Sequence, residues 1–121
     1  MTITSYTTHW HNRDNVTIVA LQGITIIGTV RLDFHGEGKK ECYLWNLHVS
    51  EDFRRRGIAK SLMQFAIMIA RDRQVPTVEL EWDKRDTPCE ILDWYVRLGF
   101  TEKEIGSGNM LMVKELKGGN P

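Results

Sequence analysis

The chain of 121 residues is 41% hydrophobic and 26% charged, and its 16 basic residues balance its 16 acidic residues. This length supplies one hydrophobic core, so we expect a single domain over residues 1–117 and a flexible tail at residues 118–121. A net charge of zero argues against a general attraction to nucleic acid or to an anionic membrane. No stretch approaches the ~20 apolar residues that cross a bilayer, so we expect a cytoplasmic protein with no membrane partner.

Four strands are predicted in the first half of the chain. Threonine and aromatic residues predict the first over Thr2–His11, and a turn at residues 12–15 leads to the second over Val16–Leu21. The third, over Ile24–Phe34, alternates so that one face holds Ile24, Ile26, Gly28, Val30, Leu32 and Phe34. A glycine inside a strand indicates a bulge, so we expect one at Gly28. These three strands should form an antiparallel meander.

The fourth strand is predicted over Cys42–Val49 and leads into a basic loop and a long helix. Its alternation places on one face Tyr43, Trp45, Leu47 and Val49, and on the other Cys42, Leu44, Asn46 and His48. Residues 50–53 turn the chain, and a helix opens within Arg54–Ala59 and runs to about residue 73. Its apolar stripe is predicted to contain Ile58, Leu62, Phe65 and Ile69.

Another strand, a helix and two strands are predicted downstream. The strand over Thr77–Trp82 alternates, so that Glu79, Glu81 and Asp83 share a face. Thr87 caps the helix, which runs to Leu98 and is followed by strands from Phe100 and over Met110–Leu116. His9 and His11 share one face of the first strand without a spaced third ligand, so no metal is expected.

The basic loop predicts a phosphate site. The N–H groups of a first helical turn lack intrahelical partners, and the helix dipole adds positive charge there. Gly57 permits close approach of a ligand, and Arg54, Arg55 and Arg56 supply full positive charge. The loop lacks the lysine of a Walker loop and the three glycines of a dinucleotide fingerprint. We therefore expect a cofactor that carries a di- or triphosphate.

Two stretches carry a resemblance to a known family. The pattern R-x-x-G-x-A after Leu47-His-Val49 resembles the acetyl-CoA pyrophosphate loop of the GCN5-related N-acetyltransferases (GNAT family), with Ala59 in place of the last glycine. A second stretch, Trp94-Tyr-Val-Arg-Leu-Gly-Phe100, resembles the "lYeklGF" signature of that family. The resemblance covers roughly residues 24–116. It implies an α/β fold with a mixed, mainly antiparallel sheet of about seven strands and two helices.

One element of the family fold is missing from the sequence. Members carry two helices between their first and second strands, whereas only residues 12–15 separate these strands here. The loss should leave a shallow acceptor groove and expose apolar sheet surface, which makes a homodimer plausible.

The resemblance implies direct acetyl transfer from acetyl-CoA, as a co-substrate, to an amine acceptor. Leu47 and Val49 would hold the pantetheine arm, and the loop that ends in Gly57, Ile58 and Ala59 would hold the pyrophosphate. Tyr95 matches the family tyrosine that protonates the departing thiolate, and its ordinary pKa of about 10 keeps it protonated at neutral pH. Packing beside Trp94 is the alternative role for Tyr95.

The general base is less clearly indicated. Many members carry an acid at the position of Asn46, which cannot accept a proton. His48 titrates in the right range, although a strand histidine is more often structural. Glu79 and Glu81 could act as bases through water, or they could attract a cationic acceptor and bind it together with Asn46. The alternative is that the two glutamates form a solvated face of the sheet.

Two alternatives remain open at this point. Asn46, the Pro88 that replaces a family asparagine and the missing helices also fit a non-catalytic interaction protein with this fold, with or without CoA binding. Nucleic-acid binding through the arginine run is disfavoured by the lack of a broader basic stripe. The acceptor amine, in a small molecule or a protein, cannot be identified from the sequence.

Overall fold

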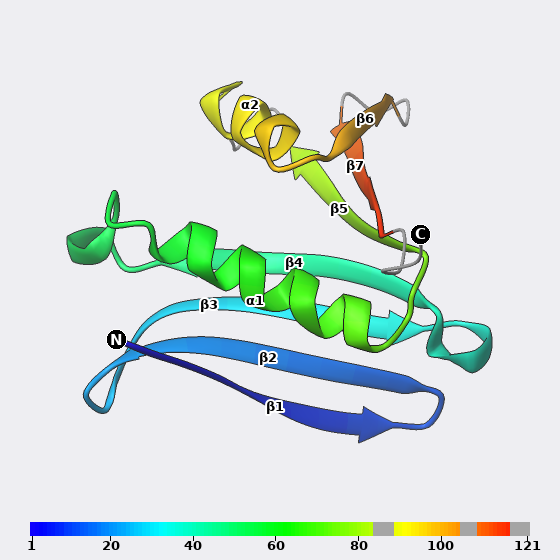
Figure 1. Ribbon diagram of the computed structural model, residues 1–121, viewed down its shortest axis with the longest axis horizontal. Helices are drawn as coiled ribbons and strands as arrows, with labels where there is room; N and C mark the ends of the chain where they lie inside the picture. The colour runs from blue at the N-terminus through cyan, green and yellow to red at the C-terminus, as the bar shows by residue number, and fades with distance from the viewer. Residues whose placement is uncertain (84–88, 105–108, 117–121) are drawn as a thin grey trace.

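The computed structural model describes residues 1–83, 89–104 and 109–116. Within them seven strands form one sheet in the order β1-β2-β3-β4-β5-β7-β6, accompanied by two helices (Figure 1). The strands are β1 (Thr2–Trp10), β2 (Arg13–Gln22), β3 (Thr25–His35), β4 (Glu41–Val49), β5 (Thr77–Asp83), β6 (Thr101–Glu104) and β7 (Asn109–Glu115). The helices are α1 (Ile58–Asp72) and α2 (Cys89–Arg97), with short 3-10 turns η1 (Glu37–Lys39) and η2 (Glu51–Phe53). The predicted fold class is confirmed.

The first three strands form the predicted antiparallel meander, joined by tighter turns than expected. β2 begins at Arg13 rather than Val16, because pairing with β1 continues to Trp10 opposite Arg13. His11 and Gly23 take the left-handed backbone that two-residue hairpin turns require, with φ of 53° and 63°. No helix lies between β1 and β2, as predicted. The predicted helix cap at Thr87 and Pro88, the turn at residues 106–108 and the tail lie outside the described residues.

A bulge in β3 changes which isoleucines are buried. Ala20 lies opposite Gly28 while Leu21 lies opposite Ile26, so Ile27 is the extra residue. The predicted bulge near Gly28 is therefore present. The predicted sharing of one face by Ile24, Ile26 and the residues from Gly28 onward is wrong: Ile24 and Ile26 are exposed, and Ile27 is buried with the core. An extra residue reverses the alternation along the strand, which a strict period of two cannot anticipate.

α1 packs on one face of β2, β3 and β4. The predicted stripe is only half right, since Phe65 and Ile69 are partly buried and the fully buried positions are Ile58, Leu62, Met63, Ala66 and Ala70. Small alanines and Gly28 bring the helix close to the sheet. A Cβ atom added to Gly28 would meet Cδ1 of Leu62 at 3.0 Å. Among the described residues, no helix is both long and apolar enough to cross a membrane.

The face of β1–β4 opposite α1, here called the open face, carries no helix in the described part of the chain. Cross-strand pairing places on it Tyr6, Thr17, Arg31 and Trp45 in one row, and Thr8, Asn15, Asp33 and Tyr43 in the next. The Arg31 guanidinium lies 5.3 Å from the Trp45 ring centroid. The expected exposed apolar surface is present only in part: Tyr6 and Trp45 are exposed on this face, but polar side chains lie between and beside them.

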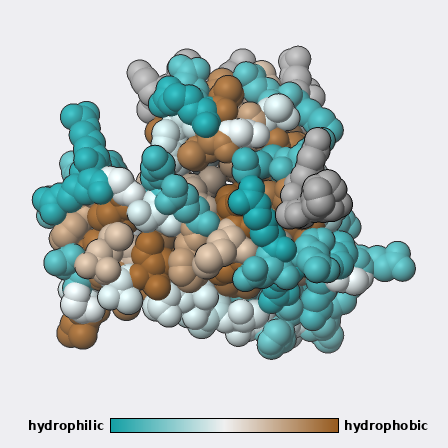
Figure 2. All heavy atoms as spheres, in the orientation of Figure 1, coloured by the Kyte–Doolittle hydropathy of each residue, from teal (hydrophilic) through white to brown (hydrophobic). Residues whose placement is uncertain are grey.

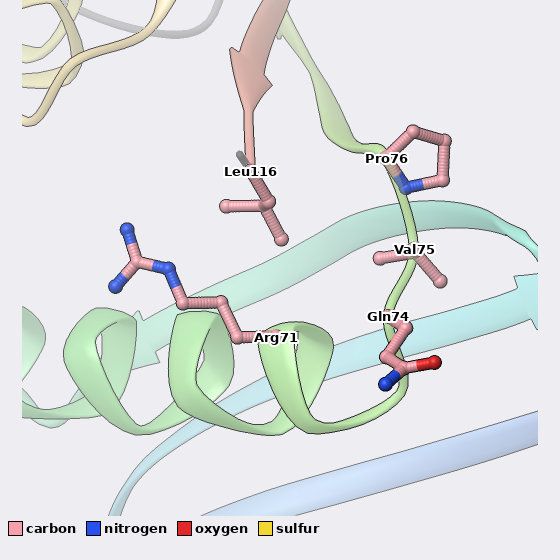
Figure 3. Close-up of a pocket in the computed structure, with 5 residues that line it drawn as sticks. All are labelled: Arg71, Gln74, Val75, Pro76 and Leu116. Atoms are coloured by element: carbon pink, nitrogen blue, oxygen red, sulfur yellow. The ribbon is translucent and has the colours of Figure 1, made fainter. Parts of the chain in front are cut away.

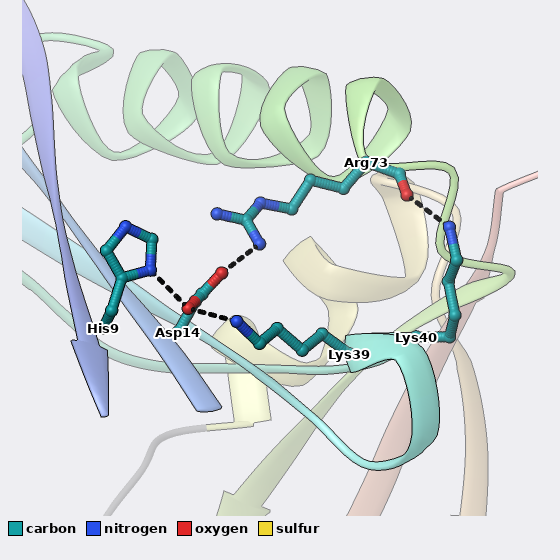
Figure 4. Close-up of polar contacts among 5 residues, drawn as sticks. All are labelled: His9, Asp14, Lys39, Lys40 and Arg73. Carbon is teal, nitrogen blue, oxygen red and sulfur yellow. Dashed lines mark hydrogen bonds and ion pairs between the residues drawn. The ribbon is translucent and has the colours of Figure 1, made fainter. Parts of the chain in front are cut away.

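The C-terminal end of α1 is tied to the start of β2 by a buried carboxylate (Figure 4). Asp14 is only 4% exposed and accepts hydrogen bonds from Arg73 Nη1 at 2.8 Å and Lys39 Nζ at 3.0 Å. Nδ1 of His9 lies 2.6 Å from the same carboxylate. The hydrogen bonds from Arg73 and then from His9 hold the pKa of Asp14 far below its usual range. The Arg73 guanidinium also lies 4.3 Å from the Phe34 ring centroid.

Candidate active site

The central strands separate and create the main cavity of the molecule. β4 and β5 run parallel and pair at Tyr43 and Glu79, the one register pair between them in the described residues. Toward Val49 the two strands diverge (Figure 1). A cavity of about 700 Å³ opens beyond this point, between the end of β4, the start of α1 and one face of α2. In Figure 2 hydrophobic side chains continue from the surface of α1 toward α2, flanked by hydrophilic ones.

A bulge at Asn46 forms the β4 wall of the cavity. Arg31 lies opposite Trp45 and Thr29 lies opposite His48, so β4 carries one residue more than β3 here, and Asn46 has a φ of 57°. The bulge reverses the alternation, so the predicted sharing of faces is wrong beyond Trp45. Leu47 and Val49 pack against the core, and His48 falls on the same side as Trp45.

The edge of β4 that faces the cavity is available to a ligand. Past Tyr43, no strand of the described residues pairs with this edge. Leu47, His48 and Val49 line the cavity along it. An extended chain with amide groups can pair with such an edge as an additional strand does.

The start of α1 forms the end of the cavity that suits an anion. Gly57 is the N-cap residue, with φ of 79°, and makes no side-chain capping bond. The Ser61 N–H donates to the Gly57 carbonyl at 3.0 Å, so the three preceding N–H groups lie ahead of this first intrahelical bond. No acidic residue lies in the first turn, and a Cβ atom added to Gly57 would meet nothing within 4 Å. The predicted phosphate site is therefore open to a ligand.

The three arginines of the loop differ in their surroundings. Arg54 Nε donates to the Val49 carbonyl at 3.0 Å and so joins the loop to the end of β4. The Arg56 guanidinium lies 5.2 Å from the Phe53 ring centroid and does not line the cavity. Arg55 lines the cavity, has a φ of 64°, and makes no hydrogen bond or ion pair within the described part of the chain. Among the three loop arginines, Arg55 is therefore the one whose guanidinium has no partner in the described part of the chain.

Tyr95 lies on the opposite wall, on α2. Its ring packs against Phe100 at 5.9 Å and Trp94 at 5.4 Å between centroids, and it lines the cavity. Burial raises the pKa of Tyr95, so the phenol stays protonated well above neutral pH. The packing role and the acid role considered for this residue are compatible in this position.

The remaining candidates separate into two groups. His48 lines the cavity, whereas Asn46, Glu79 and Glu81 do not. Glu79 lies opposite Tyr43 in the sheet, and Glu81 contributes, after burial, to raising the pKa of Tyr43. The structure thus brings His48 to the same cavity as Tyr95 and the loop, and leaves the two glutamates outside its lining, on the face away from α1.

Five further residues line the cavity without having been identified from the sequence: Phe53, Lys60, Ile91, Trp94 and Arg97. A signal for the α2 residues was present, because Ile91 precedes Trp94 by three positions and Tyr95 by four, and these spacings bring side chains together on a helix. Lys60 adds a cation in the first turn of α1.

A second cavity, of about 260 Å³, lies at the other end of α1 (Figure 3). Its lining consists of Arg71, Gln74, Val75, Pro76 and Leu116, and the Leu116 N–H donates to the Pro76 carbonyl at 2.9 Å. It gathers no group that accepts or donates a proton near neutral pH, so the larger cavity is the candidate active site.

Comparisons with known proteins agree with this fold and site. A model of the acetyltransferase (GNAT) family matches residues 2–107, so the chain belongs to this family, and the resemblance noted in its sequence is confirmed. An uncharacterized N-acetyltransferase of Methanocaldococcus jannaschii is 38% identical over 80 residues, which are 66% of this chain and 34% of that protein. The chain therefore spans about a third of the length of this relative.

Two solved structures illustrate the shared fold. The GNAT domain of S. lividans PAT has a TM-score of 0.75 and 24% identity, over 90% of this chain and 65% of that chain. The PaiA N-acetyltransferase of Thermoplasma acidophilum, solved in complex with coenzyme A, has a TM-score of 0.72 and 18% identity, over 84% and 61% of the two chains.

Proposed function

We propose that this protein is an acetyl-CoA-dependent N-acetyltransferase, which transfers an acetyl group directly to a primary amine of a small molecule or protein. One observation carries the proposal. A single cavity joins an uncapped helix N-terminus and the loop residue Arg55 to a partly buried tyrosine and a histidine. Family membership and a relative solved with coenzyme A support the same ligand.

The pyrophosphate of acetyl-CoA occupies the start of α1. The N–H groups of Ile58 and Ala59 donate to its oxygens, and Gly57 leaves room for the close approach. Arg55 adds a full positive charge, whereas Arg54 shapes the loop through the Val49 carbonyl. Arg56, stacked on Phe53, reaches at most the outer phosphate of the adenosine. The pantetheine amides pair with the free edge of β4 at Leu47 and Val49.

The chemistry needs two proton movements. The neutral amine attacks the thioester carbonyl, and the carbon–sulfur bond breaks as the acetyl group moves to nitrogen. Tyr95 donates its phenolic proton to the departing thiolate, and its raised pKa ensures that the proton is present. His48, on the opposite wall, accepts the proton that the amine releases, directly or through water.

The acceptor reaches this cavity from the side away from α1, where Asn46, Glu79 and Glu81 lie. An ammonium group is attracted by the two glutamates before it loses its proton. We propose in addition a cytoplasmic location, one domain over residues 1–117 with a flexible tail at 118–121, and a homodimer as the working form.

A non-catalytic interaction protein that keeps the GNAT fold is the second candidate. Asn46 favours it, because this side chain cannot act as a base and lies outside the cavity lining. Turnover separates the two candidates, since only the transferase releases coenzyme A in the presence of an amine.

The first test is calorimetric titration with acetyl-CoA of the wild type, Gly57→Glu and Gly23→Glu. Gly23 is a matched control, because it also has a positive φ and an added Cβ would also meet nothing within 4 Å. We expect one-site binding by the wild type and the control, and at least a 100-fold loss for Gly57→Glu, since it places bulk and negative charge among the N–H donors. Absence of binding by the wild type would contradict the proposal.

Turnover is then measured as release of free thiol from acetyl-CoA across a panel of primary amines. Polyamines, aminoglycosides, peptides with a free N-terminus and lysine-containing peptides sample the acceptor classes. Release above the hydrolytic background that falls in Tyr95→Phe identifies the transferase. Tight binding of acetyl-CoA without amine-dependent release would favour the non-catalytic candidate.

A further inference from the structure

The two edges of the sheet are protected to very different degrees. β1 and β6 are its outer strands in the described part of the chain. β6 has four residues, among them the exposed and charged Glu102 and Lys103. β1 has nine residues and contains no aspartate, glutamate, lysine, arginine or proline. Natural proteins block exposed edges with charge, proline, bulges or short length, and β1 uses none of these.

The geometry of β1 also favours pairing. Its nine residues pair with β2 from Thr2 to Trp10 without a register shift, so no bulge turns the outer edge away. Its histidine, His9, is engaged with Asp14 on the α1 side of the sheet. On the open face Tyr6 and Trp10 are 57% and 69% exposed. The outer main-chain groups of β1 therefore form an uncharged pairing surface with aromatic side chains beside it.

We propose that β1 pairs antiparallel with β1 of a second copy and forms a symmetric homodimer. Full overlap of two nine-residue strands places Tyr6 opposite Tyr6 and Thr4 opposite Thr8, so each contact repeats across the two-fold axis. No like charges oppose each other in this register, and threonine and aromatic residues are favourable cross-strand pairs. A second copy is thus the partner whose edge matches in length, charge and pattern.

The contact includes the exposed aromatic side chains of β1 as well as its main chain. A specific interface buries about 1,200–2,000 Å² in total. A fully covered aromatic side chain buries about 150–250 Å², so the four exposed aromatics of a dimer add several hundred Å² to the strand contact.

The dimer leaves the candidate active sites independent. The two-fold axis is perpendicular to the sheet, so the two seven-stranded sheets become one, with both open faces on the same side. The cavities lie beyond β4 in each copy, three strands away from the contact. Dimerisation and acetyl-CoA binding are therefore separable measurements, and failure of one does not imply failure of the other.

The test compares two double variants by analytical ultracentrifugation and light scattering over a range of protein concentrations. Thr4→Lys with Thr8→Lys sets like charges opposite each other, whereas Thr4→Lys with Thr8→Glu sets opposite charges in the same places. We expect a dimeric wild type, a dimer retained by the lysine–glutamate variant, and a dissociation constant raised at least about tenfold for the lysine–lysine variant. Met68→Lys, an exposed change on α1, is the control and should leave the dimer intact.

Circular dichroism and acetyl-CoA titration verify that each variant is folded. Amide hydrogen exchange of the unaltered protein gives a measurement that needs no variant: outer amides of β1, and not those of β6, should gain protection as concentration rises. A monomeric wild type at about 100 μM, a dimer that survives in the lysine–lysine variant, or equal dissociation of both double variants would each overturn the proposal.

Discussion

The two ends of α1 differ in how their backbone groups are satisfied. At the C-terminal end the carbonyls of Ile69, Ala70 and Arg71 accept N–H groups from the following turn, and the Arg73 carbonyl accepts Lys40 Nζ at 3.0 Å. At the N-terminal end Gly57 provides no cap, and no acidic residue offsets the helix dipole. At the C-terminal end, the protein itself therefore supplies hydrogen-bond donors for the last carbonyl groups, and these bonds anchor the helix. The N-terminal end has no such partner in the described part of the chain, as the proposed phosphate site requires.

The same contrast applies to the charged side chains at each end. Arg73 at the C-terminal end is bound to Asp14 and packs on Phe34. Arg55 at the N-terminal end has no hydrogen bond or ion pair within the described residues. Substitutions at one end should therefore change the free energy of unfolding, and substitutions at the other should change ligand affinity. The predictions below test this division, from the largest expected effect to the smallest.

Asp14→Ala should destabilise the fold by about 2–3 kcal/mol, because it removes the shared acceptor of Arg73, Lys39 and His9 and leaves cations without a partner. Urea unfolding monitored by tryptophan fluorescence measures the change. Asp72→Ala, an exposed carboxylate on the last turn of α1, serves as the control and should change the free energy of unfolding by less than about 0.5 kcal/mol. Acetyl-CoA affinity should remain unchanged in both variants. A large loss of affinity in Asp14→Ala without unfolding would contradict the division.

Tyr95→Phe should lower kcat by about 10–100-fold while the Kd of acetyl-CoA stays within about twofold, since the ring and its packing on Phe100 are retained. Steady-state thiol release and calorimetry provide the two numbers. Because burial raises the pKa of Tyr95, the alkaline limb of the wild-type pH profile should lie above pH 10 or be absent. An unchanged kcat in Tyr95→Phe would leave this tyrosine with packing alone.

Arg55→Ala should weaken acetyl-CoA binding by about tenfold, because it removes a free guanidinium from the cavity. Arg56→Ala, one position away, should weaken binding by less than about threefold, since Arg56 stacks on Phe53 outside the cavity lining. Titrations at two salt concentrations compare them, and the Arg55 effect should shrink as salt rises. Equal losses for the two variants would refute the assignment of different roles to them.

The smallest expected effect concerns the pH dependence of the free energy of unfolding. The pKa of Asp14 is lowered in the folded state, so the ionised carboxylate favours folding fully above the unfolded pKa of about 4. That contribution should decline as the pH falls below about 5 toward the folded pKa. Wild type should thus lose more stability than Asp14→Asn between pH 6 and pH 3, as measured by thermal unfolding at each pH. Parallel declines in the two proteins would show that other carboxylates dominate.

Much of the fold was predictable from local patterns. The strand, basic loop and helix around Gly57 were identified because the turn, the arginines and the apolar stripe are adjacent in the sequence. The antiparallel order of β1, β2 and β3 was predicted from the meander, whereas the order β5-β7-β6 was not predicted. The family resemblance rests on the same local stretches and covers most of the chain.

The predictions failed where the register between neighbouring strands determines which side chains face the core. Ile27 is buried in place of Ile26, and Leu47 and Val49 change faces, because each strand holds one residue more than its neighbour at a bulge. A bulge belongs to a pair of strands, so one strand read alone shows at most a glycine or an asparagine that tolerates positive φ. Here Gly28 gave such a signal, and Asn46 was interpreted only as a missing acid.

The sequence by itself determined most of the secondary structure, the basic loop and the family, since each depends on residues close together in the chain. Only the tertiary structure decided which loop arginine has no partner among the described residues, that Glu79 and Glu81 lie outside the cavity lining, and that His9, Asp14, Lys39 and Arg73 meet. Those outcomes depend on contacts across as many as 59 positions of the chain. The physical reason is that burial and charge pairing are settled when strands and helix pack together, whereas propensity and turn chemistry act within a few residues.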